Sequence, residues 1–258
     1  MINVKVTDSV GTIVLERPEK CNALNRRMIE ELTQALSDLN QEKRVRGIIL
    51  TASGAHFCAG LDLKELHSTL SAEDAMQQWF NDAQAMQTLL ENLLQLPKPI
   101  VAAVDGAALG SGLALVLACD LVVASHRASF GAPAAKHGVV AGLVAPLANF
   151  RCGAAAASRI LIGADTLSAT EAKAIGLVHH IVDPELIWVR AKTWLDNVAM
   201  GAAESIQLSK RLINDMIGET MLSQLASGAA SMATSLTTEA ACEGLAAFVD
   251  KREPKFPK

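Results

Sequence analysis

The sequence predicts an α/β protein in which short buried strands alternate with helices, followed by a helical C-terminal region. Three observations support this prediction. Short runs rich in β-branched residues alternate with segments whose apolar residues recur at helical spacing. The strand-like runs stop near residue 185, and only helical patterns follow. Half of the 258 residues are hydrophobic, so the chain can bury a large core.

The first predicted elements are two strands, a helix and a third strand. Residues 4–6 and 12–15 read as strands around a turn at 8–11, which predicts an opening hairpin. Residues 25–40 place apolar side chains at helical spacing. Residues 46–51 form an apolar, β-branched run that is typical of a buried strand.

A second round of the same alternation follows. Residues 72–96 predict an amphipathic helix that ends at residues 97–99, because the prolines there cannot continue it. Residues 100–104 predict a short strand, and residues 112–118 a closely packed helix of small apolar residues. Residues 121–124 predict the next strand.

The rest of the chain is predicted to be mainly helical. The predicted helices are residues 145–150, 154–161, 185–200, 203–217 and 219–249. We therefore divide the chain into an α/β core, residues 1–185, and a C-terminal helical region, residues 186–258. Small residues at 226–231 would let helices approach closely, within one subunit or between subunits.

Composition argues against several classes of protein. A net charge of −4 gives no overall basic surface for nucleic acid or an anionic membrane. Asp105 and Asp120 interrupt the longest apolar candidate before the roughly 18 residues of a spanning helix. Five cysteines without a CxxC pair argue against a disulfide framework and a structural zinc site. The N-terminus lacks the pattern of a signal peptide, so we expect a cytoplasmic location.

Two glycine-bearing turns are the most informative features of the chain. We call residues 58–62 the first glycine turn and residues 106–112 the second glycine turn; each follows an apolar run. Backbone amides in such turns can donate to a carbonyl oxygen that gains negative charge during a reaction. The amide of Ser111 would also point out of a helix N-terminus, where the helix dipole favours negative charge. The two turns therefore predict an oxyanion site for a thioester enolate.

Five segments resemble the motifs of the crotonase, or enoyl-CoA hydratase/isomerase, superfamily. The segments match those motifs in both order and spacing, and they are residues 16–24, 56–63, 106–120, 167–178 and 248–252. The resemblance covers nearly the whole chain. It implies a spiral of ββα units with a helical trimerisation region, assembled as a homotrimer or a dimer of trimers. It also implies that the ligand is an acyl-CoA thioester.

The resemblance assigns roles to individual residues. It implies that the backbone amides of Leu61 and Ser111 form the oxyanion site. It also implies that six residues lie beside the nucleotide part of coenzyme A, namely Lys20, Ala59, Asp62, Leu63, Phe248 and Lys251. The last two would approach from a C-terminal helix of the same or a neighbouring subunit. Coenzyme A would enter as part of the substrate, with no permanently bound cofactor and no metal.

The sequence departs from the family pattern at two positions. Hydratases of this family carry glutamate where this chain has Ala114 and Ala134, and the alignment there needs no gap. Addition of water needs a base to activate the water and an acid to protonate the α-carbon. Each positioned group commonly contributes about 10²–10⁴ in rate. We therefore expect this chain to be a poor hydratase.

A histidine is the best candidate to take over proton transfer. His137 lies three residues after Ala134 and titrates near neutral pH, although it could equally be a surface residue beside Lys136. With His137 as acid or base, the enzyme could isomerise, decarboxylate, cleave or hydrolyse a CoA thioester. Decarboxylation needs no base for its first step. The alternatives are a non-catalytic acyl-CoA-binding protein and, disfavoured by the charge, an RNA-binding protein.

Four other polar side chains near the motifs are expected to be structural. We expect the Ser111 hydroxyl to cap the following helix. We expect Cys58 to pack as a small apolar residue. His179 and His180 match no metal-binding spacing and are expected to be structural or exposed.

Overall fold

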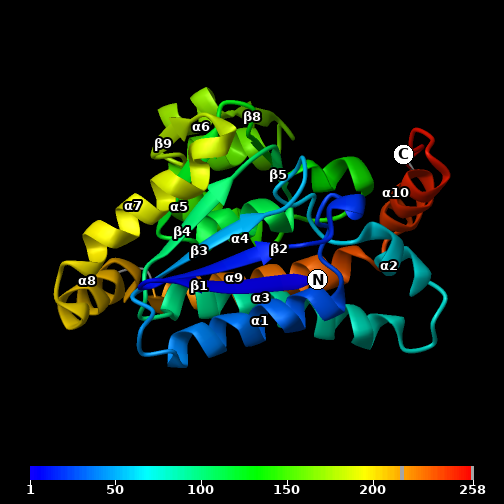
Figure 1. Cartoon of the computed structure of the whole chain (residues 1–258). Helices are drawn as coiled ribbons and strands as arrows, with labels where there is room; N and C mark the ends of the chain where they lie inside the picture. Colours follow the sequence, from blue (N-terminus) through cyan, green and yellow to red (C-terminus); the bar gives the residue numbers. More distant parts are fainter. Residues whose placement is uncertain (216–217, 257–258) are drawn as a thin grey trace.

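A six-stranded sheet lies at the centre of the computed structural model, which describes residues 1–215 and 218–256 (Figure 1). The strands, in their order across the sheet, are β1 (Ile2–Thr7), β2 (Val10–Leu15), β3 (Gly47–Ala52), β4 (Ile100–Val104), β6 (Leu121–Ser125) and β9 (His180–Val182). β1 and β2 pair as an antiparallel hairpin, which confirms the predicted opening hairpin. The other neighbouring strands pair in parallel.

Helices cover both faces of this sheet, and alternate residues of the strands face opposite layers. Ile48 and Leu50 of β3 join a core with α1 (Arg26–Gln41) and α3 (Ala75–Gln95). Ile49 points the other way and packs with α7 (Ile187–Ala199). Strands buried on both faces read as continuous apolar runs, which explains why the sequence pattern located them.

A second, three-stranded sheet stands beside the first. Its strands are β5 (Ala107–Leu109), β7 (Ser129–Gly131) and β8 (Thr166–Ser168). Each has three residues, too few to show a periodicity, so the sequence pattern did not predict these strands. The short helices α2 (Leu63–Ser68) and α6 (Ala169–Ala174) were not predicted either.

The predicted helices are largely confirmed, with one correction. α4 (Ser111–Ala118) and α8 (Ala203–Asp215) lie where they were expected, although residues 216–217 fall outside the described part. α5 (Val144–Leu161) is interrupted at Gly153, whose non-helical backbone agrees with two predicted helices. The single helix predicted over residues 219–249 is wrong. The chain instead forms α9 (Gly218–Ser235) and α10 (Glu239–Asp250), because Thr238 caps a new helix by accepting from Ala241 N at 3.1 Å.

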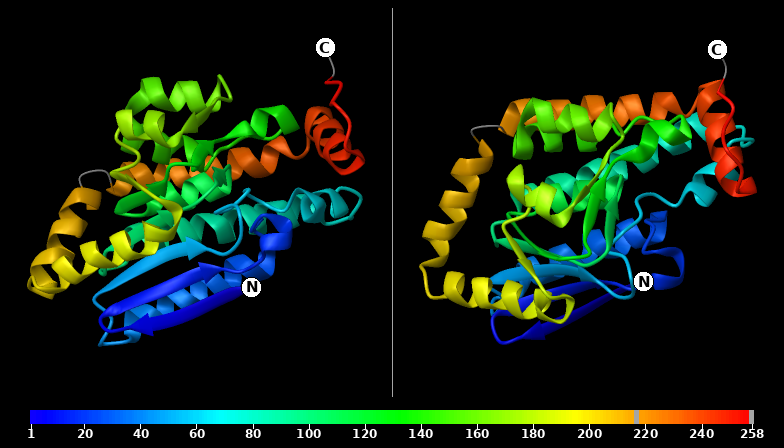
Figure 2. Two further views of the ribbon diagram at one scale, coloured as in Figure 1. Left: turned by 45° about the horizontal axis from the view of Figure 1, so that its top comes forward. Right: turned by 90° about the horizontal axis from the view of Figure 1, so that it is seen from above.

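The C-terminal helical region packs into the same core as the strands. α9 runs along α3 and also contacts α5, as both views of Figure 2 show. Lys210 of α8 donates to Leu93 O, to Lys98 O and, at 2.8 Å, to Asp120 Oδ2. α10 lies at the opposite end of the molecule from α8, against α2 (Figure 2). Among the described residues, no helix is both long and apolar enough to cross a membrane.

Candidate active site

The two glycine turns lie directly against each other. Cys58 N donates to Ala107 O at 3.0 Å, and Leu109 N donates to Cys58 O at 2.9 Å. Gly60 suits this approach because its φ is +102° and because a Cβ there would lie only 3.0 Å from Leu109 O. The fold therefore brings together the two turns that the sequence singled out.

The Leu61 and Ser111 amides are free to bind a ligand. Leu24 N donates to Gly60 O, and Asp62 N donates to Leu24 O. The amide of Leu61, which lies between them in an extended segment, points the opposite way. Ser111 is the first residue of α4, where amides have no acceptor within the helix. Within the described part of the chain, no hydrogen bond engages either N–H.

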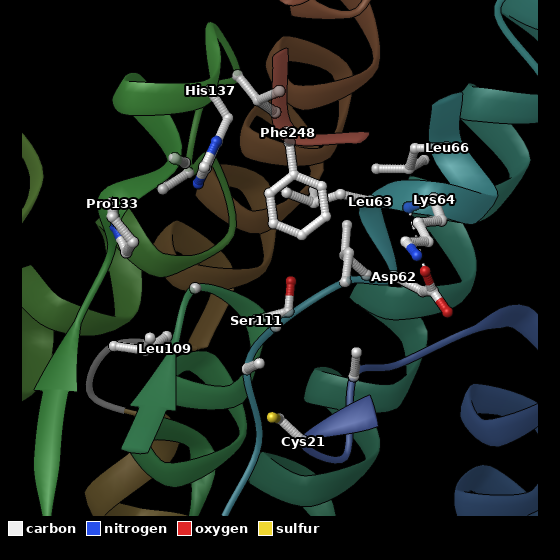
Figure 3. A pocket seen from close by; sticks show the side chains of 18 of the residues that line it. Cys21, Asp62, Leu63, Lys64, Leu66, Leu109, Ser111, Pro133, His137 and Phe248 are labelled. Atoms are coloured by element: carbon white, nitrogen blue, oxygen red, sulfur yellow. Dashed lines mark hydrogen bonds between the residues drawn. The ribbon is translucent and has the colours of Figure 1, made fainter. Parts of the chain in front are cut away.

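A pocket of about 540 Å³ opens at these turns (Figure 3). Apart from Lys251, every residue that the sequence assigned to the site lines it, namely Lys20, Ala59, Leu61, Asp62, Leu63, Ser111, His137 and Phe248. Lys251 instead ends α10 in a left-handed conformation. Phe248 reaches the pocket from α10 of the same chain.

The outer rim of the pocket carries charged groups. Lys20, at the end of the short helix η1 (Pro18–Lys20), and Lys64 of α2 are exposed there. Asp62 is held in place, since it pairs with Arg17 at 2.8 Å and caps α2 by accepting from Lys64 N at 3.1 Å. The rim therefore presents two exposed ammonium groups, together with the exposed carboxylate of Glu19.

The inner walls of the pocket are apolar. They include buried side chains that the sequence analysis missed, namely Leu66, Leu143, Val144 and Met232. The segment around Leu143 carries no motif, and Met232 is far away in the sequence, so no local signal could have identified either. Among the described residues, the lysines that line the pocket are Lys20 and Lys64, and no arginine lines it.

His137 provides a titratable group in these walls. It ends the short helix η2 (Pro133–His137), and its ring meets that of Phe248 edge to face, with centroids 5.6 Å apart. Burial, assisted by the charge of Lys136, lowers the pKa of His137 below its usual 6.5. The lowered pKa favours the neutral ring, which is the form that accepts a proton.

Ala114 and Ala134, the two positions at which the sequence led us to expect a poor hydratase, occupy different surroundings. Ala134 of η2 lines the pocket, whereas Ala114 of α4 is fully buried and does not line it. Neither methyl group can transfer a proton. Proton transfer in this pocket therefore requires a side chain other than those of Ala114 and Ala134.

The structure settles the expectations for the neighbouring polar side chains. The prediction that the Ser111 hydroxyl caps α4 is wrong, because Gly110 is the N-cap residue and no side chain caps the helix. Cys58 packs as predicted: it is fully buried, and burial raises the pKa of its thiol to about 12. His179 accepts from Val122 N at 3.1 Å, and the ring of His180 packs on that of Trp194, so both are structural as expected.

Comparisons with known proteins agree on one group. A family model described as enoyl-CoA hydratase/isomerase matches residues 5–258. The human enoyl-CoA hydratase domain-containing protein 2, mitochondrial, is 34% identical over 254 residues, which cover 96% of this chain and 85% of that protein. An enoyl-CoA hydratase/isomerase structure from Pseudoalteromonas atlantica T6c is 31% identical, with a TM-score of 0.86 and 99% of both chains covered. Another, from Xanthobacter autotrophicus Py2, is 27% identical with a TM-score of 0.87, covering 100% of this chain and 98% of that one.

Proposed function

Because the chain belongs to the enoyl-CoA hydratase/isomerase family, we propose that its pocket binds an acyl-CoA thioester and stabilises the enolate of that thioester. The observation that carries this proposal is the pair of unengaged amides, Leu61 and Ser111, on two turns in contact. Two fixed donors that converge on one oxygen stabilise negative charge as it develops. Loss of one such donor typically costs about 2.7–4 kcal/mol of transition-state stabilisation.

The charge distribution supports one orientation of the ligand. The exposed rim with Lys20 and Lys64 suits the phosphates of coenzyme A, and the apolar interior suits an acyl chain. An acyl group that carries a carboxylate would lose its hydration without finding a lysine or arginine partner among the described inner residues. We therefore propose an uncharged acyl group, which favours proton transfer over decarboxylation.

His137 is the proposed acid and base. Its neutral ring takes a proton from an acyl carbon beside the double bond, and the electron pair moves onto the thioester oxygen between the two amides. The protonated ring then returns the proton to a different carbon, which shifts the double bond. This scheme needs no carboxylate at position 114 or 134. The absence of both carboxylates also favours a second candidate, a family member that binds acyl-CoA without turnover.

The test is incubation with a panel of enoyl-, hydroxyacyl- and malonyl-type CoA esters, with products identified by mass spectrometry and binding measured by calorimetry. Isomerised product supports the proposal. Binding without product supports the non-catalytic candidate. Failure to bind any acyl-CoA contradicts both.

Met232 is predicted to limit the length of the acyl chain. It is 6% exposed and lines the inner wall from α9. Each additional buried methylene contributes about 0.8 kcal/mol, or about fourfold in affinity, until the chain meets this side chain. We expect Met232→Ala to move the limit to longer chains. The measurement is the dissociation constant for straight-chain acyl-CoAs of increasing length.

A control for this prediction lies on the same helix. Met221 is equally buried on α9 but lines a different cavity, so Met221→Ala should lower stability without moving the length limit. An identical limit in wild type and Met232→Ala would contradict the assignment.

We also propose that an exposed apolar face of α8 mediates assembly into the trimer that the family resemblance implies. Three large apolar side chains of this helix are exposed to solvent: Leu208 is 56% exposed, Leu212 66% and Ile213 59%. Apolar side chains gathered on one exposed helix often mark a contact with another protein. Leu212→Asp is expected to lower the mass of the assembly measured by light scattering. A wild-type protein that stays monomeric at high concentration would contradict the proposal.

The proposed location is the cytoplasm. All five cysteines have free thiols, which suits a reducing compartment. The human relative is named as mitochondrial, so fractionation of cells that express this chain is the appropriate measurement.

A further inference from the structure

The side chain of Ser111 carries a hydroxyl that the fold does not use. The residue is 8% exposed, and in the described part of the chain its Oγ makes no hydrogen bond. It is not a helix cap, since Gly110 holds that position. The described fold therefore leaves this hydroxyl available to a ligand.

The direction of the side chain indicates what the hydroxyl serves. In a helix every Cα–Cβ bond tilts toward the N-terminus, so at the first residue of α4 the hydroxyl projects from the same helix end as the free amide. Figure 3 shows this oxygen directed into the pocket, beneath the ring of Phe248. Among the described residues, every fully enclosed side-chain oxygen has a hydrogen-bond partner. Because Ser111 Oγ has none, it is not enclosed and remains accessible from the pocket.

A nucleophilic role does not fit these surroundings. A serine nucleophile needs a general base within hydrogen-bonding distance. Among residues 1–215 and 218–256, no histidine, carboxylate or amine is hydrogen-bonded to Ser111 Oγ. The hydroxyl is therefore suited to donate a hydrogen bond to a ligand rather than to attack it.

We propose that the Ser111 hydroxyl donates a third hydrogen bond to the thioester oxygen, beside the amides of Leu61 and Ser111. This inference rests on the proposed function. The amides are fixed by the backbone, whereas a hydroxyl rotates and can follow the oxygen as the carbonyl becomes an enolate. The apolar inner walls exclude competing water and strengthen such a bond.

The test compares variants that keep the backbone amide. Ser111→Ala removes the hydroxyl and Ser111→Gly removes the Cβ as well, and each is expected to lower turnover about tenfold. Their affinity for free coenzyme A should not change, because that molecule has no thioester oxygen. Ser111→Thr retains a hydroxyl and is expected to recover most of the turnover.

Infrared difference spectroscopy supplies a readout that a structural role would not change. The probe is butyryl-CoA with an isotope-labelled thioester carbonyl. Its stretching frequency should fall on binding to wild type and fall less in Ser111→Ala and Ser111→Gly. The control is Ser125→Ala, which removes a buried hydroxyl bonded to Asp105, outside the pocket. That variant should lose stability and keep the wild-type frequency.

The outcomes separate this inference from the function on which it rests. A wild-type carbonyl frequency in bound Ser111→Ala and Ser111→Gly overturns the third hydrogen bond but leaves acyl-CoA binding intact. Turnover of Ser111→Thr at the level of Ser111→Ala also overturns it. Failure of the wild-type protein to bind butyryl-CoA contradicts the proposed function itself.

Discussion

Gly60→Ala is expected to lower turnover of a CoA thioester by about 10²–10³-fold, the effect of losing an oxyanion donor. The added Cβ would lie 3.0 Å from Leu109 O and 3.5 Å from Ser111 N. Both neighbours are backbone atoms. The 3.5 Å to Ser111 N is ordinary contact, but the 3.0 Å to Leu109 O is tight, and Leu109 is tied to the first glycine turn by its own N–H donating to Cys58 O. A shift of a few tenths of an ångström, together with the strain of alanine at a φ of +102°, is expected to displace the Leu61 amide from its proposed position beside the Ser111 amide.

A matched substitution separates this effect from backbone strain. Gly176 also has a positive φ, +81°, and among the described residues a Cβ there would meet nothing within 4 Å. Both Gly60→Ala and Gly176→Ala should lower the free energy of unfolding by about 1–3 kcal/mol, measured by chemical denaturation. Turnover should fall in Gly60→Ala alone. Wild-type turnover in a folded Gly60→Ala protein would rule out the oxyanion site.

His137→Ala is expected to lower turnover by about 10²–10⁴-fold, the usual contribution of a positioned acid or base. Acyl-CoA affinity should stay close to that of wild type, because the oxyanion amides and the apolar walls remain. Steady-state kinetics and calorimetry measure the two quantities separately. His67→Ala is the control, since His67 lies on α2 but does not line the pocket. Unchanged turnover in His137→Ala would remove this residue from the mechanism.

The pH profile provides an independent test of the same role. Burial lowers the pKa of His137 below 6.5, so the neutral base persists to lower pH than a free histidine would allow. Activity should therefore be lost as pH falls, with the midpoint of kcat/KM below pH 6.5, and this limb should be absent in His137→Ala. A midpoint above 6.5 would contradict the assignment.

The sequence predicted the parts of the fold whose signals are long and local. The buried parallel strands, the long helices and the α/β crotonase-like fold class are confirmed by the structure and its similar structures. The break before Thr238 was missed, because no proline or glycine marks it and the capping threonine is the main local cue. The three-residue strands of the second sheet depend on pairing between distant segments, which periodicity cannot detect.

The parts of the site that the sequence predicted are likewise those with local signals. The motifs located the glycine turns and the charged rim, because each is a short continuous segment. Met232 and Leu143 entered the pocket only through the packing of α9 and the loop before α5. The surroundings of the Ser111 hydroxyl were mispredicted, since whether a serine at a helix start caps the helix depends on a one-residue difference in where that helix begins.

The pocket takes walls from Lys20 near one end of the described chain and from Phe248 near the other. A ribosome adds roughly 5–20 residues per second, so on the order of ten seconds or more separates the synthesis of these two walls. Throughout that interval a nascent chain cannot gain stability from ligand binding, because the ligand stabilises only a completed site. Whatever structure the sheet and its helices reach during translation therefore depends on their own packing, because the proposed ligand can stabilise the fold only after synthesis of α10.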